Sequence, residues 1–197
     1  MSIHHRIFCR SAKWERKLNA ELVPWLVGGA ALGNRVLEIG AGAGSGTQSL
    51  LGHAEVVVAL ERDFWSLRSL RGRMKHPGLS VIGGDAARMP FRSETFSSVI
   101  AIMVLHHVWP LEAQQRVIAE AFRVLRPGGV FIGLDARPEA FGSRIVHYGD
   151  RILPVDRSLL SAYCADVGFG RLHTDDRGRK FRFRATRPVE CYDEIGL

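Results

Sequence analysis

Several things are missing from this 197-residue chain, and each absence excludes a class of protein. It has three cysteines, Cys9, Cys164 and Cys191, which lie far apart and form no C-x-x-C pair. Neither a disulfide framework nor a zinc site is therefore expected. No window holds about 18 consecutive apolar residues, so we predict no membrane span. The basic first residues lack the apolar stretch of a secretory signal, and we expect a cytoplasmic protein.

Internal repeats, low-complexity tracts and domain linkers are also missing. The eight histidines show no spacing typical of metal ligands, and no metal is expected. Hydrophobic residues make up 46% of the chain, which is enough for a sizeable core and too much for a disordered protein. We therefore expect one globular domain over residues 1–197.

Glycine, by contrast, is frequent, and four of the 21 glycines fall in one short segment. The stretch from Asn34 to Thr47 runs an apolar strand into a turn that has glycine at positions 40, 42, 44 and 46. Glycine permits positive φ and lets the backbone approach a ligand closely. The spacing of Gly40, Gly42 and Gly44 is G-x-G-x-G, which differs from the G-x-G-x-x-G of dinucleotide sites. Glu38 before the turn would repel a phosphate and suits a positively charged ligand, such as S-adenosylmethionine.

Further apolar runs follow at regular intervals, and polar residues stand where they end. Glu61 follows the run at 56–60 and lies 21 residues after Gly40, where a carboxylate can accept both hydroxyls of an adenosine ribose. A run at 79–82 leads to Asp85 and Ala86, which could bind an adenine ring through the carboxylate and the backbone N–H. Two more runs cover 96–102 and 130–134.

This ordered series over residues 34–134 resembles the class I S-adenosylmethionine-dependent methyltransferases. Within that class it is most similar to the type 11 small-molecule group, which includes the quinone-biosynthesis C-methyltransferases. The chain departs from the group at Ser97, where an aspartate is usual, and at Met103, where a polar residue is common. The resemblance implies S-adenosylmethionine as cofactor and S-adenosylhomocysteine as product. The cofactor residues that it implies are Glu38, Gly40, Gly42, Gly44, Glu61, Arg62, Asp85, Ala86 and Ile102.

The expected fold is α/β: a single Rossmann-like, doubly wound domain whose mostly parallel seven-stranded sheet ends in a C-terminal antiparallel hairpin. Residues 1–26 are predicted to hold an amphipathic helix, from Ser11 to Leu26, and a possible lid formed by residues 1–10. Residues 34–134 form the cofactor-binding core. Residues 155–187 supply the last helix and the hairpin, whose strands at 171–174 and 181–186 flank a turn at Asp175–Gly178.

The chemistry of methyl transfer asks little of side chains, because orientation alone can supply much of the acceleration. His106 and His107 follow the fourth strand, on the side of the sheet where ligands bind, and either could serve as general base. The alternative is that the pair packs and caps the helix that follows. Proposed acceptor contacts are Phe8, His107, Asp135 and Tyr148. Trp109 and Phe141 offer further aromatic walls for a small-molecule acceptor, and a homodimer could close the site as well as a monomer.

Lys and Arg outnumber Asp and Glu by 27 to 20, and many cluster at 177–187. A basic stripe can follow phosphates, so an RNA methyltransferase is one alternative. The favoured interpretation is an amphipathic strand that buries Phe181 and Phe183 and exposes the basic residues between them. The chain also lacks the Asn/Asp-Pro-Pro-Tyr/Phe motif that grips a flipped base. The charge would then favour an anionic substrate or an acidic partner. A cofactor-binding scaffold without catalysis is the other alternative.

Overall fold

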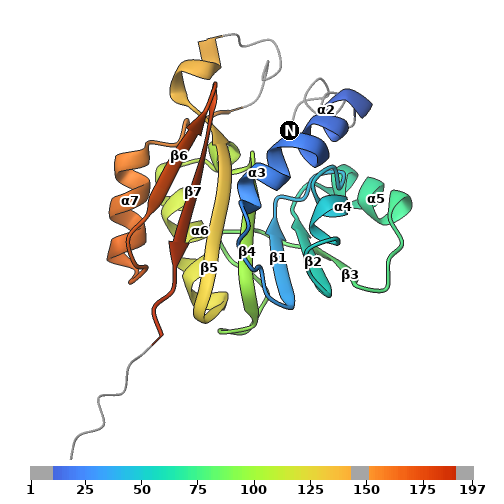
Figure 1. Cartoon of the computed structure of the whole chain (residues 1–197), viewed down its shortest axis with the longest axis horizontal. Helices are drawn as coiled ribbons and strands as arrows, with labels where there is room; N and C mark the ends of the chain where they lie inside the picture. Colours follow the sequence, from blue (N-terminus) through green and yellow to red (C-terminus); the bar gives the residue numbers. More distant parts are fainter. Residues whose placement is uncertain (1–10, 143–150, 190–197) are drawn as a thin grey trace, which may run out of the picture.

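The computed structural model of the protein describes residues 11–142 and 151–189. Seven strands form one sheet in the order β3-β2-β1-β4-β5-β7-β6 (Figure 1). Strands β1 to β5 are parallel, whereas β7 pairs antiparallel with both β5 and β6. This arrangement confirms the predicted mostly parallel sheet with a C-terminal antiparallel hairpin. The strands are β1 (Arg35–Ile39), β2 (Val56–Glu61), β3 (Leu79–Gly83), β4 (Phe96–Ile102), β5 (Leu125–Ala136), β6 (His173–Arg177) and β7 (Lys180–Thr186).

Helices cover both faces of the sheet, as the alternating strand and helix pattern predicts. The helical elements are α2 (Ala12–Lys17), η1 (Leu18–Leu22), α3 (Val23–Val27), α4 (Thr47–Leu50), α5 (Phe64–Arg73), η2 (Leu105–His107), α6 (Leu111–Val124), η3 (Pro138–Gly142) and α7 (Arg157–Asp166). No helix within the described residues is long and apolar enough to cross a membrane.

The core consists of two apolar layers, one on each face of the sheet. Because side chains alternate along a strand, Phe131 of β5 packs on the side of α6 and α7, and its neighbour Ile132 packs on the side of α2 to α3. Phe131 and Ile132 are both almost fully buried. The central strands are thus covered on both faces, which accounts for their nearly continuous apolar sequences.

The predicted N-terminal helix is interrupted. Ser11 caps its start by accepting a hydrogen bond from the Trp14 backbone N–H at 3.2 Å, and Gly28 ends it in the left-handed conformation. Between α2 and α3 lies the π-helical turn η1. Pro24 provides the physical reason, because it has no N–H for the regular helical hydrogen bond to residue 20.

The C-terminal hairpin differs from the prediction in two respects. Asp175 to Arg177 belong to β6 instead of the turn, and Arg177 pairs with Lys180 across a two-residue turn in which Gly178 has φ +59°. Along β7, Phe181, Phe183 and Ala185 are buried, which agrees with the period-two pattern. The basic residues between them, however, are only half exposed.

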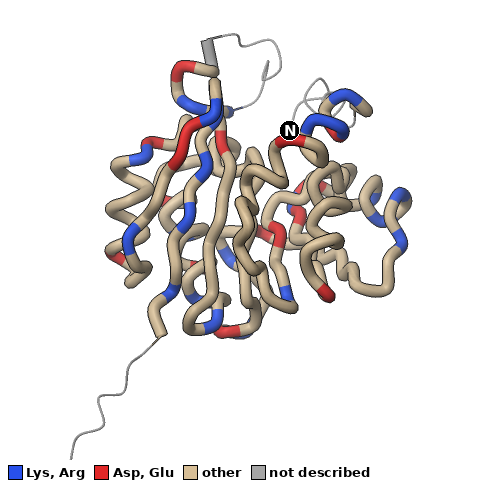
Figure 2. Tube along the Cα trace, viewed as in Figure 1, with Lys and Arg blue, Asp and Glu red and all other residues tan. Residues whose placement is uncertain are grey.

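The reason is that α3 packs on the face of the sheet next to β7: in Figure 1 it lies beside β5, the strand that pairs with β7. Arg182 donates to the Trp25 carbonyl and pairs with Asp175 at 3.0 Å, and Arg184 donates to the Val27 carbonyl at 2.9 Å. Both carbonyls belong to the last turn of α3, where helical partners are missing. The blue bands along β7 in Figure 2 are therefore contacts within the molecule.

Candidate functional site

A cavity of about 790 Å³ opens where the parallel strands end, and it contains most of the predicted site. The strand order reverses between β1 and β4, since β2 and β3 lie on one side of β1 and β5 lies on the other. Ligands of open α/β sheets bind at such a switch point, beyond the carboxyl ends of the strands. Here the glycine turn after β1 and residues 102–104 after β4 form adjacent walls of the cavity.

Eight of the nine predicted cofactor residues line this cavity, and Gly44 does not. A Cβ at Gly44, where φ is +92°, would collide with the Leu70 side chain of α5, so this glycine allows close packing of the turn on the helix. At Gly42, where φ is +58°, a Cβ would meet nothing within 4 Å. Gly42 therefore presents bare backbone to open space, which is the arrangement that a closely bound ligand requires.

Glu38 is the most deeply buried acid of the cavity. Its side chain is 2% exposed and accepts a hydrogen bond from the Thr47 hydroxyl at 2.5 Å. Burial raises the pKa of Glu38 to about 7, against the lowering effect of the Thr47 hydrogen bond, and the charge of Glu61 raises it further. A ligand with positive charge would stabilise the ionised carboxylate. The sulfonium and amino groups of S-adenosylmethionine fit this requirement.

Glu61 and Asp85 form the opposite wall. The Glu61 carboxylate accepts from the backbone N–H of Gly42 at 2.7 Å and from that of Asp63 at 2.6 Å, so it fixes the glycine turn relative to β2. Asp85 accepts from the Ala87 N–H at 2.9 Å, and its second oxygen lies 3.7 Å from Arg62. These acids stand at the ends of two neighbouring strands, as the sequence predicts.

His106 forms a buried pair with Asp135 at another wall of the cavity. The imidazole Nδ1 lies 2.6 Å from Asp135 Oδ1, and both side chains are 1% exposed. The other carboxylate oxygen accepts from the His106 backbone N–H at 3.3 Å. Such a carboxylate places the imidazole proton on Nδ1, which makes Nε2 the basic nitrogen of the ring.

The turn that carries His106 is held from two further sides. Gln114 of α6 donates its side-chain amide to the Leu105 carbonyl and to the Leu153 carbonyl, each at 3.0 Å. The Leu153 N–H in turn donates to the His106 carbonyl at 2.9 Å. The imidazole is thus fixed by β5, by α6 and by the segment before α7.

The acceptor contacts predicted from sequence have different outcomes. His107 lines the cavity, and its ring centroid lies 4.0 Å from that of His106. Asp135 is not among the residues that line it, and its carboxylate is buried and hydrogen-bonded to His106, so its predicted contact with the acceptor stays a prediction. Phe8, Tyr148 and the proposed lid of residues 1–10 lie outside the described residues. Trp109 lines the cavity and is 53% exposed.

Sequence reasoning missed several residues of the site. Thr47, the hydrogen-bond partner of Glu38, is a hydroxyl residue at the start of the helix after the glycine turn. Its position in the sequence could have indicated this contact. Leu18 of the N-terminal helix also lines the cavity, whereas Trp14, which lines it too, is a residue for which the sequence already suggested a role in covering the site. Arg116 and Arg151 line it as well, and no motif indicates them.

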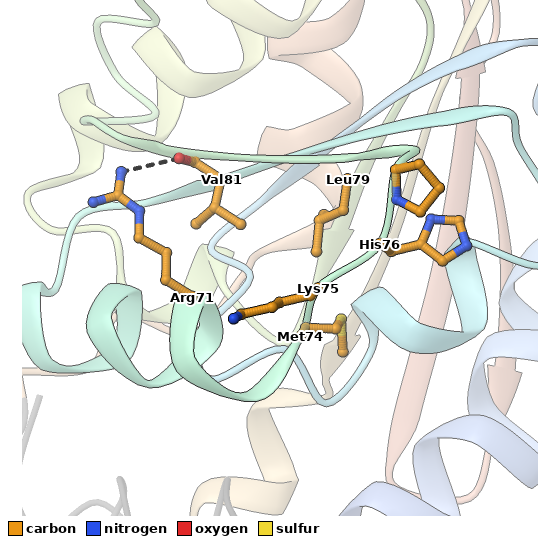
Figure 3. A pocket seen from close by; sticks show the side chains of 7 residues that line it. Arg71, Met74, Lys75, His76, Leu79 and Val81 are labelled. Atoms are coloured by element: carbon orange, nitrogen blue, oxygen red, sulfur yellow. Dashed lines mark hydrogen bonds between the residues drawn. The ribbon is translucent and has the colours of Figure 1, made fainter.

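A second hollow, of about 540 Å³, lies at the sheet edge between α5 and β3. Figure 3 shows Arg71, Lys75 and His76 around it. Arg71 donates to the Val81 carbonyl at 3.0 Å, on the edge strand. This contact occupies a carbonyl that would otherwise be open to another chain.

The fold and the sequence were compared with known proteins. A protein of known structure from Pyrococcus horikoshii is 19% identical to the chain and has a TM-score of 0.79, with 95% of this chain and 99% of that chain covered. At this identity the likeness shows the fold alone. A probable S-adenosylmethionine-dependent methyltransferase of Mycolicibacterium smegmatis is 34% identical over 100 residues, which are 51% of this chain and 37% of that protein. The demethylmenaquinone methyltransferase of Renibacterium salmoninarum is 32% identical over 115 residues, 58% and 46% of the two chains.

The chain is similar in sequence to S-adenosylmethionine-dependent methyltransferases and shares their fold. More particularly, its residues 37–133 match the family model described as a methyltransferase domain, which is the segment that forms β1 to β5. The matched part is less than half the length of either relative.

Proposed function

We propose that the protein transfers a methyl group from S-adenosylmethionine to a small-molecule acceptor. The observation that supports this most directly is the pairing of an open glycine backbone, Gly42, with the buried Glu38 in one cavity. Glu38, Glu61 and Asp85 would hold the amino acid part, the ribose and the adenine respectively. When bound, the cofactor supplies a methyl group attached to a sulfonium sulfur, and this sulfur is a neutral thioether once the methyl group has been transferred.

His106 is the proposed general base. It lines the cavity, and Asp135 fixes its ring orientation and tautomer at 2.6 Å. A base is needed where the acceptor hydroxyl, amine or carbon acid loses a proton as the new bond forms. Asp135 acts through His106 and is therefore a positioning residue. Trp14 and Trp109 would exclude water from the reacting atoms.

The contacts that the basic hairpin makes within the molecule favour a small acceptor over RNA. Arg182 and Arg184 are engaged with carbonyls of α3 and are only half exposed, so they do not form an open track for phosphates. The relative from Renibacterium salmoninarum is by its name a methyltransferase of demethylmenaquinone, a small molecule, which agrees with this choice.

Calorimetry with S-adenosylhomocysteine and with NAD tests the cofactor assignment. We expect micromolar affinity for S-adenosylhomocysteine and none for NAD, because Glu38 disfavours a pyrophosphate. Tighter binding of NAD would contradict the proposal. Incubation of metabolite extract with methyl-labelled S-adenosylmethionine, followed by mass identification of the product, then tests the transfer. Cofactor binding without turnover of any acceptor would favour the non-catalytic scaffold.

A further inference from the structure

The charged residues that line the cavity are unevenly distributed. Its acids, Glu38, Glu61, Asp63 and Asp85, gather around the glycine turn and the ends of β2 and β3, together with Arg62, which lies 3.7 Å from Asp85. At the other end, beyond His106, the charged side chains that line it are Arg116 of α6 and Arg151. Since the acidic end suits the cofactor, the basic end is left for the acceptor.

Neither of these two arginines has a carboxylate partner among the described residues, and this distinguishes them from Arg73, Arg123 and Arg157, which form ion pairs at 2.9, 2.7 and 2.9 Å. Arg151 instead lies over the Trp109 ring, with its guanidinium carbon 4.7 Å from the ring centroid. A guanidinium over an aromatic ring can still use its N–H groups to bind an oxyanion.

Two hydrogen bonds hold the chain close to Arg151. Leu153, two positions after Arg151, donates to the His106 carbonyl and accepts from Gln114, so Arg151 lies close in sequence to a residue that is bound to the turn of the proposed base. The first turn of α6 adds to the positive potential. Pro110 and Ala113 line the cavity at the start of this 14-residue helix, whereas Glu112 is exposed and does not line it.

We propose that the acceptor is an organic anion: its oxyanion binds Arg116 and Arg151, and its apolar or aromatic body packs on Trp109. This inference rests on the proposed function, because it assigns the acceptor end of the same cavity. The apolar lining at this end, which includes Val108, Pro110 and Ala113, suits the carbon skeleton of such a molecule. The oxyanion fixes the acceptor while His106 takes its proton.

A matched pair of fluorescent probes tests this inference without knowledge of the acceptor. The anion 1-anilinonaphthalene-8-sulfonate and the neutral N-phenyl-1-naphthylamine differ by the sulfonate alone. Each is titrated into the full chain saturated with S-adenosylhomocysteine. We expect Arg116→Gln and Arg151→Gln each to weaken binding of the anion by about tenfold, the loss of one charge-assisted contact, and to leave binding of the neutral probe unchanged. Arg92→Gln, an exposed arginine away from the cavity, makes the same charge change as a control.

Several results would overturn the inference. Among them are failure of the wild type to bind the anion, an equal loss for both probes, or an equal loss in Arg92→Gln. If either variant instead lowers the affinity for S-adenosylhomocysteine, the guanidinium serves the cofactor, and the acceptor assignment is wrong while the proposed function stands. Failure of the wild type to bind S-adenosylhomocysteine contradicts the proposed function itself, so the two failures are distinguishable.

Discussion

Glu38 carries the clearest electrostatic consequence at the scale of single residues. Burial raises its pKa to about 7, so Glu38 retains its proton at pH values where an ordinary carboxyl group is ionised. In the cofactor-free protein, the contribution of Glu38 to folded stability decreases as pH rises from about 4.5 to about 7, because the folded protein retains a proton that the unfolded chain releases. A bound cation reverses this preference by favouring the carboxylate.

We therefore predict that the affinity for S-adenosylhomocysteine increases with pH through about 7. A single linked proton limits the increase to at most about tenfold per pH unit below the pKa, and the increase levels off above it. Calorimetry at about pH 6, 7 and 8, in buffers of different ionisation enthalpy, measures both the affinity and the released proton. Glu38→Gln should bind more weakly and remove the pH dependence. Glu112→Gln, on the exposed side of α6, should keep it, and a flat wild-type profile would argue against the role of Glu38.

The pair formed by His106 and Asp135 leads to a second prediction at this scale. His106→Asn should lower turnover of the acceptor found in the extract screen by roughly 10²- to 10⁴-fold and leave affinity for S-adenosylhomocysteine unchanged. Asp135→Asn keeps the shape of the side chain but removes its charge. It should lower kcat and shift the ¹⁵N resonances of His106 away from the Nδ1–H tautomer.

His173→Asn is the control for this experiment, because His173 is exposed at the start of β6 and does not line the cavity. Normal turnover in His106→Asn would sink the proposal of a base. A drop in melting temperature with normal turnover would show that His106 only packs, which is the alternative that the sequence left open for His106 and His107.

At the scale of elements, the N-terminal helix links the hairpin to the cavity. Arg182 and Arg184 hold the carboxyl end of α3, and Trp14 and Leu18, nearer the other end of the helical segment, line the cavity. Glu15 also pairs with Arg73 of α5 at 2.9 Å. The hairpin therefore positions a wall of the cofactor site from a distance.

The double substitution Arg182→Met and Arg184→Met should remove about 2 kcal/mol of stability, since each contact is a partly exposed hydrogen bond to a charged donor. For a chain of this size that lowers the melting temperature by roughly 4 to 8 °C. Affinity for S-adenosylhomocysteine should fall at the same time, because the helix is no longer held in place. Arg171→Met, an exposed residue before β6, is the control. Unchanged cofactor affinity in the double variant would show that the helix does not depend on the hairpin.

At the scale of the whole molecule, several of the basic residues behind the net charge of +7 make contacts within the fold. Much of the basic charge near the C-terminus binds the N-terminal helix or closes ion pairs, as Arg157 does with Asp176 at 2.9 Å. The cavity itself is lined by acids and Arg62 around the glycine turn, and by Arg116 and Arg151 in the part that we propose for the acceptor. A single site can then attract a cationic cofactor and an anionic acceptor.

Much of this protein follows from the sequence by itself, because the signals are local. Apolar runs that end in Glu38, Glu61 and Asp85 specify parallel strands with polar residues at one edge of the sheet. The alternation along 180–186 specifies which side chains of β7 are buried. The contacts of Ser97, a departure from the usual pattern, are not local: its hydroxyl lies 2.8 Å from the Leu32 and Arg35 carbonyls, 65 and 62 residues away, and accepts from the Arg35 N–H at 3.1 Å.

The tertiary structure alone decided the contacts between distant segments. Asp135 and His106 are 29 residues apart, and the pairing of β4 with β5 brings the carboxylate to the imidazole. Arg184 and Val27 are 157 residues apart, and no pattern along β7 shows that a helix will cover it. The role of Gly44 depends on Leu70 of the next helix, and that of Arg151 on Trp109. Sequence periodicity reports which face of an element is buried, but not which other element covers that face.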